Sequence, residues 1–143
     1  MTTRPEQPQR PEPSDRADPV TLIGPEERRT GPPTPGMRRQ EAFASQAMWS
    51  GLVRTEPGTV SGWHHHDGYE TVVYVLSGAI RVDFGPDGAD SVTARPGDFV
   101  RVPPGTVHRE SNTSPQPAEA VVVRTGSGQP GPSTVNVAGP PQA

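Results

Sequence analysis

Three of the four histidines in this 143-residue chain stand in a row, at His64, His65 and His66. In an extended strand, residues two apart point to the same face, so His64 and His66 can face one metal ion while His65 points away. Imidazole nitrogen is a good ligand for Zn, Fe, Mn, Ni and Cu. Two ligands on one strand hold a metal weakly, so a site here needs a third ligand from elsewhere. The alternative is a solvated or chance run of histidines in a turn.

The fourth histidine, His108, is the candidate for that third ligand. It follows the stretch GDFVRVPPGTV, in which a Gly-Asp turn leads into an apolar strand and PPG reverses the chain. A hairpin of this kind can return a side chain into the interior of a barrel. The alternative is an exposed histidine just after a turn.

The composition limits the other chemistry available. The chain has no cysteine and no lysine, and its 13 basic residues are all arginine. This excludes disulfides, thiolate nucleophiles, Schiff-base lysines and the lysine of phosphate-binding loops. A net charge of −3 without a basic stripe argues against a nucleic-acid partner. No apolar run is long enough to span a membrane, and the N-terminus lacks the apolar core of a signal peptide, so we expect a cytoplasmic protein with no membrane partner.

Short strands must position these histidines. Runs rich in Val, Ile, Tyr and Phe alternate with turn signals between residues 41 and 125, a pattern typical of a β-sandwich or barrel. The runs cover residues 47–53, 70–76, 79–84, 91–94, 98–102 and 119–123. We therefore predict an all-β fold, a small antiparallel β-barrel over 41–125, with a short helix possible around 38–47. A core this small would gain stability from a homodimer.

Two segments outside this core have the composition of tails. Residues 1–36 hold nine of the twenty prolines and few apolar side chains, so they cannot bury enough surface to offset their ordering entropy. We predict a disordered Pro-rich tail over 1–40. Residues 126–143, rich in Gly, Pro and Ser, predict a flexible C-terminal tail.

Taken together, the two histidine stretches resemble the two motifs of the cupin superfamily, in particular small single-domain bacterial cupins. The matching residues of the first motif are Gly58, His64, His66, Glu70 and Gly78, and those of the second are Gly97, Pro103, Gly105, His108 and Asn112. The resemblance implies a double-stranded β-helix, a jelly-roll-like barrel that is often dimeric and holds one metal ion. It places His64, His66 and His108 at the three histidine ligand positions.

The acidic ligand position of the first motif depends on the register. Glu70 has the right distance from His66, but one residue more than the family pattern separates it from Gly78. Alternation from His66 puts Glu70 inside the barrel, whereas counting back from Gly78 puts Thr71, Val73 and Val75 inside. A one-residue bulge would reconcile the two registers. We take Glu70 as the fourth ligand, with a three-histidine site lined by Thr71 as the alternative.

A metal held in this way keeps open coordination positions, as catalytic sites do. The resemblance implies one divalent ion, with Fe preferred over Zn, Mn or Ni, and a small oxygenated organic molecule as substrate. The reaction would be dioxygenase-like, or an isomerase, cyclase or decarboxylase reaction with the metal as Lewis acid. The alternative is a metal- or ligand-binding module without catalysis. A metal-free sugar-nucleotide epimerase ranks last.

Few other side chains are candidates for the chemistry. Tyr74 could donate a hydrogen bond to a developing oxyanion, and Arg54 could pair with a substrate carboxylate, so these two are our candidate catalytic residues. The remaining strand arginines, Arg81, Arg101 and Arg124, are interpreted as members of solvated strand faces.

Overall fold

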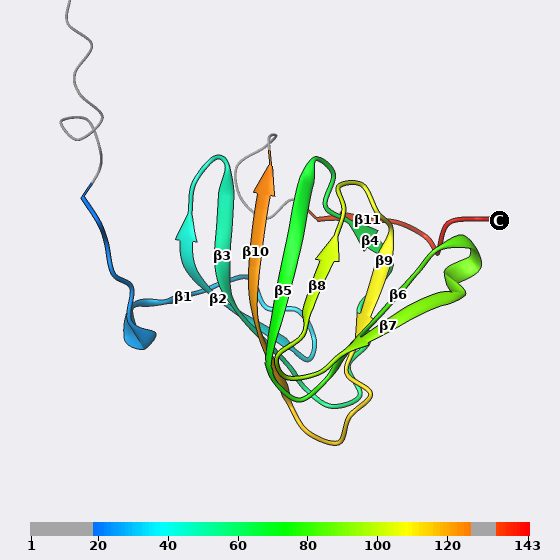
Figure 1. Ribbon diagram of the computed structural model, residues 1–143, viewed down its shortest axis with the longest axis horizontal. Helices are drawn as coiled ribbons and strands as arrows, with labels where there is room; N and C mark the ends of the chain where they lie inside the picture. Colours follow the sequence, from blue (N-terminus) through cyan, green and yellow to red (C-terminus); the bar gives the residue numbers. More distant parts are fainter. Residues whose placement is uncertain (1–18, 127–133) are drawn as a thin grey trace, which may run out of the picture.

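The computed structural model describes residues 19–126 and 134–143, and within them the chain is almost entirely β-strand, arranged in two antiparallel sheets (Figure 1). Sheet A consists, in spatial order, of β1 (Arg29–Thr30), β2 (Met37–Ala44), β3 (Met48–Thr55), β10 (Ala118–Gly126), β5 (Tyr69–Ser77) and β8 (Phe99–Val102). Sheet B consists of β11 (Val135–Asn136), β4 (His64–His65), β9 (His108–Ser111), β6 (Ile80–Phe84) and β7 (Asp90–Ala94). Two short 3₁₀ turns, η1 (Pro25–Glu27) and η2 (Pro86–Gly88), complete the described elements. The predicted all-β class is confirmed.

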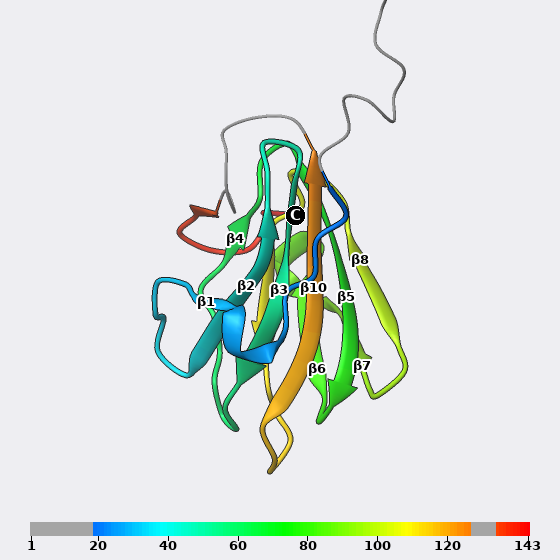
Figure 2. The same cartoon turned by 90° about the vertical axis from the view of Figure 1, so that its left-hand side faces the viewer.

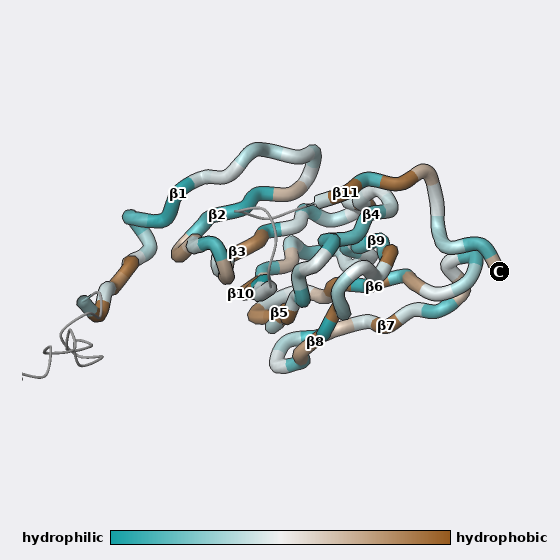
Figure 3. Tube along the Cα trace, turned by 90° about the horizontal axis from the view of Figure 1, so that it is seen from above, coloured by the Kyte–Doolittle hydropathy of each residue, from teal (hydrophilic) through white to brown (hydrophobic). Residues whose placement is uncertain are grey.

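The two sheets form two layers with a common interior. Sheet A faces the viewer in Figure 2 and sheet B lies behind it. Along the strands the colour changes repeatedly between hydrophobic and hydrophilic in the view from above (Figure 3). This follows from the two-residue period of a strand, which sends alternate side chains to the interior and to the outer face.

The register of sheet A shows which residues share the inner face. On β5, Thr71 lies opposite Arg124 of β10, and Val73 lies opposite Val122. Residues directly opposite each other in an antiparallel pair point to the same face. Val122 is buried in one apolar cluster with Trp49 and Val53. A second cluster contains Ile80, Val82 and Ala118, so the core has contributions from both sheets.

Glycines make two of the tight connections possible. Gly78, between β5 and β6, has φ of 72°, and a Cβ there would lie 2.6 Å from the carbonyl oxygen of Pro117. Gly105, in the PPG turn before β9, has φ of 71°. Both values belong to the left-handed region, where only glycine is free of steric strain. The second turn brings His108 back toward the interior, as the sequence predicted.

The folded part begins earlier than residue 41, and the helix considered around 38–47 is absent from the described chain. These residues form β2, which pairs with β3 along most of its length. The polar residues Arg38, Arg39, Gln40 and Glu41 fall on both faces of β2, which hid the alternation. Pairing with β3 decides the conformation because sheet context outweighs local propensity. Of the predicted N-terminal tail, residues 1–18 lie outside the described residues.

The end of the chain also contributes to the fold. β11 pairs with β4, with Val135 opposite His65 and Asn136 opposite His64. Further along, the amide of Val137 donates to the carbonyl of Trp63 at 3.0 Å. The flexible tail expected over 126–143 therefore needs correction for its described part, 134–143, because backbone pairing with β4 holds it. Residues 127–133 lie outside the described residues.

Candidate metal centre

Three histidines and one glutamate meet between β4, β9 and the turn that follows β4. His64, His66, His108 and Glu110 each offer a ligand atom, and these atoms all lie within 4.8 Å of one another. The three histidines are 8%, 3% and 1% exposed. We call these four residues the His–Glu cluster. It unites the three histidines that the sequence singled out.

Strand pairing brings the histidines together. His64 of β4 lies directly opposite His108 of β9, and their ring centroids are 4.3 Å apart. His66 comes from the turn after β4, and its ring centroid is 5.0 Å from that of His64 and 5.3 Å from that of His108. The Nδ1 atom of His66 lies 3.5 Å from the hydroxyl of Thr134, in the segment that leads into β11.

Backbone carbonyls orient two of the rings. Nδ1 of His64 is 2.8 Å from the carbonyl oxygen of Gly62, and Nδ1 of His108 is 2.8 Å from that of Thr106. A carbonyl can only accept, so Nδ1 carries the proton in both rings and donates it. In the neutral imidazole this leaves the lone pair of Nε2 available as a metal ligand, and such a second hydrogen bond is the usual support of a metal-binding histidine.

The electrostatics of the cluster favour neutral imidazoles at His64 and His66 and an ionised carboxylate at Glu110. Burial lowers the pKa of His64, and burial together with the charge of Arg124 lowers the pKa of His66 to about 3. For Glu110 burial opposes ionisation, but a hydrogen bond from His108 and the nearby positive charges lower its pKa to about 2. That bond joins Nε2 of His108 to Oε1 of Glu110 over 3.2 Å, so Nε2 carries a proton in this contact, and a bound metal ion would replace that proton. Burial is the largest single influence on the pKa of His108 and lowers it, but the hydrogen bond and charge of Glu110, together with the carbonyl of Thr106, outweigh burial and raise this pKa overall.

The acid of the cluster is Glu110, and Glu70, the acid we predicted, lies outside it. The Glu70 carboxylate accepts a 2.6 Å hydrogen bond from Nε of Arg101, and its side chain is 38% exposed. Straight alternation from His66 fails because the chain turns before β5 begins. Asp67 has a positive φ of 50°, and the amide of Tyr69 donates to the carbonyl of His66.

The other register is the one adopted by β5. Thr71 is 3% exposed and Val75 is fully buried, and Thr71 and Val73 line an interior cavity. Glu110 carried a signal that could have identified it, because it stands two residues after His108. The same-face rule that joins His64 and His66 also joins His108 and Glu110.

The two candidate catalytic residues lie away from the cluster. Arg54 forms salt bridges with Glu56 and Glu119, at 2.9 and 3.4 Å, and is exposed. The Tyr74 ring lies 4.6 Å from that of Phe99, which is 73% exposed. Arg54 and Tyr74 therefore lie on the outer side of sheet A. The geometry offers no contact between either residue and the His–Glu cluster.

An arginine that we had assigned to a solvated face lies inside the barrel instead. Arg124 is 7% exposed, and its guanidinium carbon lies 5.5 Å from the ring centroid of Trp49. Burial lowers the pKa of Arg124, and the charge of Arg39 lowers it further. The charge of Glu110 acts in the opposite direction, but the pKa is lowered overall. The sequence signal for Arg124 is its place in the alternating run 119–125, where it follows Val122 by two positions.

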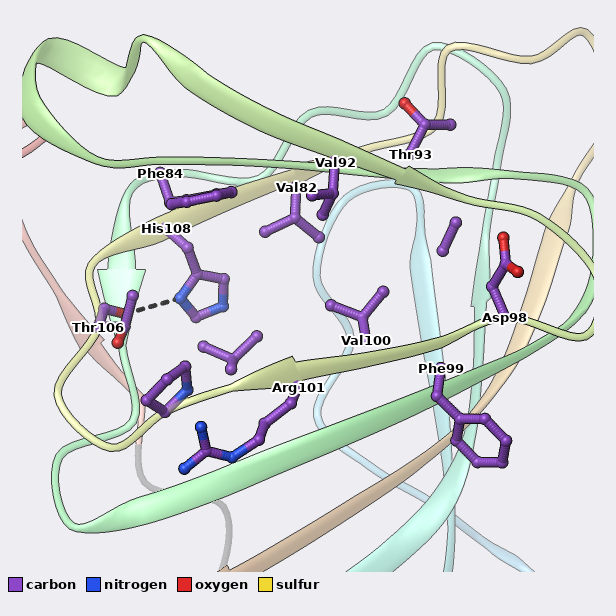
Figure 4. A pocket seen from close by; sticks show the side chains of 13 residues that line it. Val82, Phe84, Val92, Thr93, Asp98, Phe99, Val100, Arg101, Thr106 and His108 are labelled. Atoms are coloured by element: carbon purple, nitrogen blue, oxygen red, sulfur yellow. Dashed lines mark hydrogen bonds between the residues drawn. The ribbon is translucent and has the colours of Figure 1, made fainter.

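Two cavities adjoin the cluster. The larger has a volume of about 460 Å³ and is lined mainly by apolar side chains of β6, β7 and β8, with His108 at its wall. Figure 4 shows the His108 ring projecting into it, with Nδ1 bonded to Thr106. The smaller, of about 40 Å³, lies inside the barrel and is lined by Thr71, Glu110 and Arg124 among others.

This arrangement suits a divalent metal. Three buried imidazoles and one carboxylate are a donor set that Mn, Fe, Ni and Zn all accept. The neighbouring cavities leave room for a ligand beside the cluster, as a catalytic site requires. Within residues 19–126 and 134–143, no helix is long and apolar enough to cross a bilayer.

Comparison with known proteins gives a family and a set of similar structures. A family model described as "Cupin domain" matches residues 51–124. A protein with a double-stranded β-helix domain from Klebsiella pneumoniae subsp. pneumoniae MGH 78578 is 18% identical, with a TM-score of 0.65 over 84% of this chain and 99% of that one. KdgF from Halomonas sp. is 19% identical, with a TM-score of 0.64 over 76% and 96%.

A third similar structure is a larger protein. Oxalate decarboxylase from Bacillus subtilis is 23% identical, with a TM-score of 0.61 over 73% of this chain and 29% of that one. No curated protein matches this chain in sequence. At these identities the three structures establish the shared fold alone.

Proposed function

Because the chain belongs to the cupin family, we propose that it is a metal-dependent enzyme that acts on a small oxygenated organic molecule. The single observation that carries this proposal is the buried His–Glu cluster beside a cavity of about 460 Å³. His64, His66, His108 and Glu110 would hold one divalent ion. A purely structural metal site would not require such a cavity at its side.

The bound ion would supply Lewis-acid polarisation of a carbonyl or carboxylate oxygen. Glu110, ionised because its pKa lies at about 2, offsets part of the charge of the ion. The carbonyls of Gly62 and Thr106 hold two imidazoles in the tautomer that presents Nε2. The apolar wall of the larger cavity, which includes Phe84 and Val82, would take the carbon skeleton of the substrate and exclude water from it.

One similar structure supports the metal part of this proposal, because the oxalate decarboxylase of Bacillus subtilis contains Mn(II) centres. Isomerase, cyclase and decarboxylase reactions all use a metal in the Lewis-acid role. Dioxygenase chemistry instead requires a redox-active metal, which the same donor set accepts. The metal identity therefore selects between the two kinds of reaction.

Metal analysis of the protein purified without an affinity tag tests the proposal. We expect one divalent ion per chain, which His108→Ala removes and His65→Ala retains, because His65 bonds the amide of Asp67 rather than the cluster. Mn, Zn or Ni would support Lewis-acid chemistry, whereas Fe with substrate-dependent oxygen uptake would select the dioxygenase. A wild-type protein without bound metal, and unable to take up any of these ions, would refute the proposal. A full complement of metal without turnover of any carbonyl or carboxylate substrate would favour a binding module.

We further propose that the protein is a homodimer, as a small barrel core suggests. The outer side of sheet A supports this, because it carries Phe99, 73% exposed, and Leu76, 45% exposed. Sedimentation equilibrium of the wild type and of Phe99→Ser tests it. A monomeric wild type would contradict the proposal.

A further inference from the structure

Arg124 is a buried cation on which the charge of Glu110 acts through space, without a direct bond between the two. Its side chain comes from β10 into the barrel, the residue is 7% exposed, and its Nε–H has no hydrogen-bond acceptor. In the described parts of the chain it forms no salt bridge. A guanidinium stays protonated in a protein, and burying a charged group without a partner is costly. The contact with the face of Trp49 offsets only part of that cost.

Thr71, directly opposite Arg124 on β5, has the same deficiency. It is 3% exposed, and its hydroxyl has no hydrogen-bond partner. Opposite residues of an antiparallel pair lie on one face, and both side chains line the small interior cavity that Glu110 of the His–Glu cluster also lines. Two unsatisfied polar groups therefore meet at one cavity beside the proposed metal site.

The charges around this cavity point to an anion. Arg39 of β2 also lines it and forms no salt bridge within the described residues, although its Nη1 donates to the hydroxyl of Thr34. Two guanidinium groups then face one carboxylate, that of Glu110. A divalent ion on the cluster would raise the local charge by two more. Such an excess of positive charge around one cavity favours a negative ligand.

We propose that Arg124 and Thr71 bind a carboxylate group of the substrate in the cavity of about 40 Å³, next to the metal cluster. This volume holds two or three water-sized groups by an order-of-magnitude reckoning, which suits a carboxylate. The rest of the substrate lies on the cluster side, so Arg124 and Thr71 determine which molecules bind. The proposal deepens the proposed function and rests on it for the identity of the bound molecule as substrate.

The two side chains offer donors that suit this role. Nε–H of Arg124 and the hydroxyl of Thr71 are both donors, and a carboxylate accepts from two donors at once. A neutral amide of the same shape could also bond both groups, because a hydroxyl can accept as well as donate, but it brings no negative charge to the buried guanidinium. We therefore expect the site to distinguish acetate from acetamide.

The proposal is tested by measuring how tightly acetate and acetamide bind to the metal-loaded, full-length protein. Binding is monitored through the ¹³C line broadening of the labelled probes. We expect wild type to bind acetate at least about 10-fold more tightly than acetamide, since a hydrogen bond between charged groups is markedly stronger than one to a neutral group. Arg124→Gln and Thr71→Val should each weaken acetate binding about 10-fold. Arg38→Gln, which alters an exposed arginine of β2 that lines neither of the two cavities, should leave it unchanged. Equal acetate affinity in wild type and Arg124→Gln, or equal affinity for the two probes, would overturn the proposal.

Further measurements separate the test of the carboxylate site from the test of metal binding. Metal content is determined in every variant, and we expect Arg124→Gln and Thr71→Val to retain the ion. If wild type binds no metal, the proposed function fails, whereas Arg124-dependent acetate binding to that protein still supports the carboxylate site. Should Arg124→Gln not fold, Arg124→Lys and the isosteric Thr71→Val decide. Because Thr71→Val deletes only an unsatisfied hydroxyl, we expect its free energy of unfolding to be unchanged or higher; a clear loss would show a structural role and count against the proposal.

Discussion

Glu110 and Glu70 differ in their place relative to the proposed metal site: Glu110 belongs to the His–Glu cluster, whereas Glu70 pairs with Arg101. Replacing Glu110 with glutamine removes the negative charge of the His–Glu cluster and keeps the size of the side chain. The amide oxygen of glutamine can still accept the hydrogen bond from Nε2 of His108, now 3.2 Å long. The variant is therefore expected to fold, and its effect to report the charge.

The magnitude follows from the position of the carboxylate. A dication and a unit charge about 4 Å apart attract each other by about 8 kcal/mol at an effective dielectric constant of about 20. Loss of hydration of both partners cancels most of this gross attraction. Mutation of a group that only supports a metal ligand changes metal affinity by about 10–100-fold. Mutation of a direct ligand should therefore have an effect at the upper end of this range. We expect the dissociation constant of Glu110→Gln to rise about 100-fold, or by about 2.7 kcal/mol.

Competition with a chromogenic chelator for Zn²⁺ measures this constant at neutral pH. Glu70→Gln is the matched control, because Glu70 pairs with Arg101 on the outer face with a side chain 38% exposed. Exposed ion pairs contribute about 1 kcal/mol or less to stability, and nothing links this one to the cluster. Loss of zinc binding in Glu70→Gln together with its retention in Glu110→Gln would refute the reasoning and return the acid to the position that the sequence predicted.

Two predictions concern stability. The buried Asp83 accepts hydrogen bonds from Arg81 and Arg109; burial opposes its ionisation, but these cations hold its pKa below the ordinary 3.8. Asp83→Asn should therefore lower the free energy of unfolding by about 1–2 kcal/mol at neutral pH. This contribution is present above the ordinary pKa and lost as the pH falls through the folded-state pKa, so urea denaturation should show the two proteins converging in acid; a constant difference would contradict it. Val75→Ala, at a fully buried position, should cost about 2–3 kcal/mol, whereas Val92→Ala, at a residue 43% exposed, should cost well under about 1 kcal/mol; similar losses would be inconsistent with this core.

The sequence predicted the histidines because their spacing follows a local rule. His64 and His66 share a face whenever the chain is extended, and the glycine in the PPG turn can adopt the positive φ that this reversal needs. Both features are properties of a few neighbouring residues. Strand pairing then needed only to place β4 beside β9, and the double motif of the family implied that arrangement.

Glu70 shows where such local reasoning ends. Alternation holds within one strand, but the left-handed residue Asp67 and the turn after His66 reset the phase before β5 begins. Asp67 lies next to a glycine, which permits that turn without requiring it. The count back from Gly78 succeeded because Gly78 and Thr71 belong to the same continuous stretch.

Arg124 was missed for a different reason. Arginine is almost always exposed unless it is paired, and for this general reason the sequence analysis places Arg124 on a solvated strand face. Its burial depends on the register of β10 between β3 and β5, which places it opposite Thr71 and Trp49. Alternation within 119–125 places Arg124 on the same side of the strand as Val122, but that side is inward only because of this register, which involves residues far apart in the sequence.

The pairing of β11 with β4 has a consequence for the order of events during synthesis. β4 carries His64, and its partners are β9 on one side and the late-made β11 on the other. The hydroxyl beside Nδ1 of His66 also comes from Thr134. Domains form largely in the order in which the ribosome releases them. The cluster is thus assembled from histidines made early but enclosed only when residues 134–136 emerge. A nascent chain stalled before residue 134 should therefore present an open site to any metal in its surroundings.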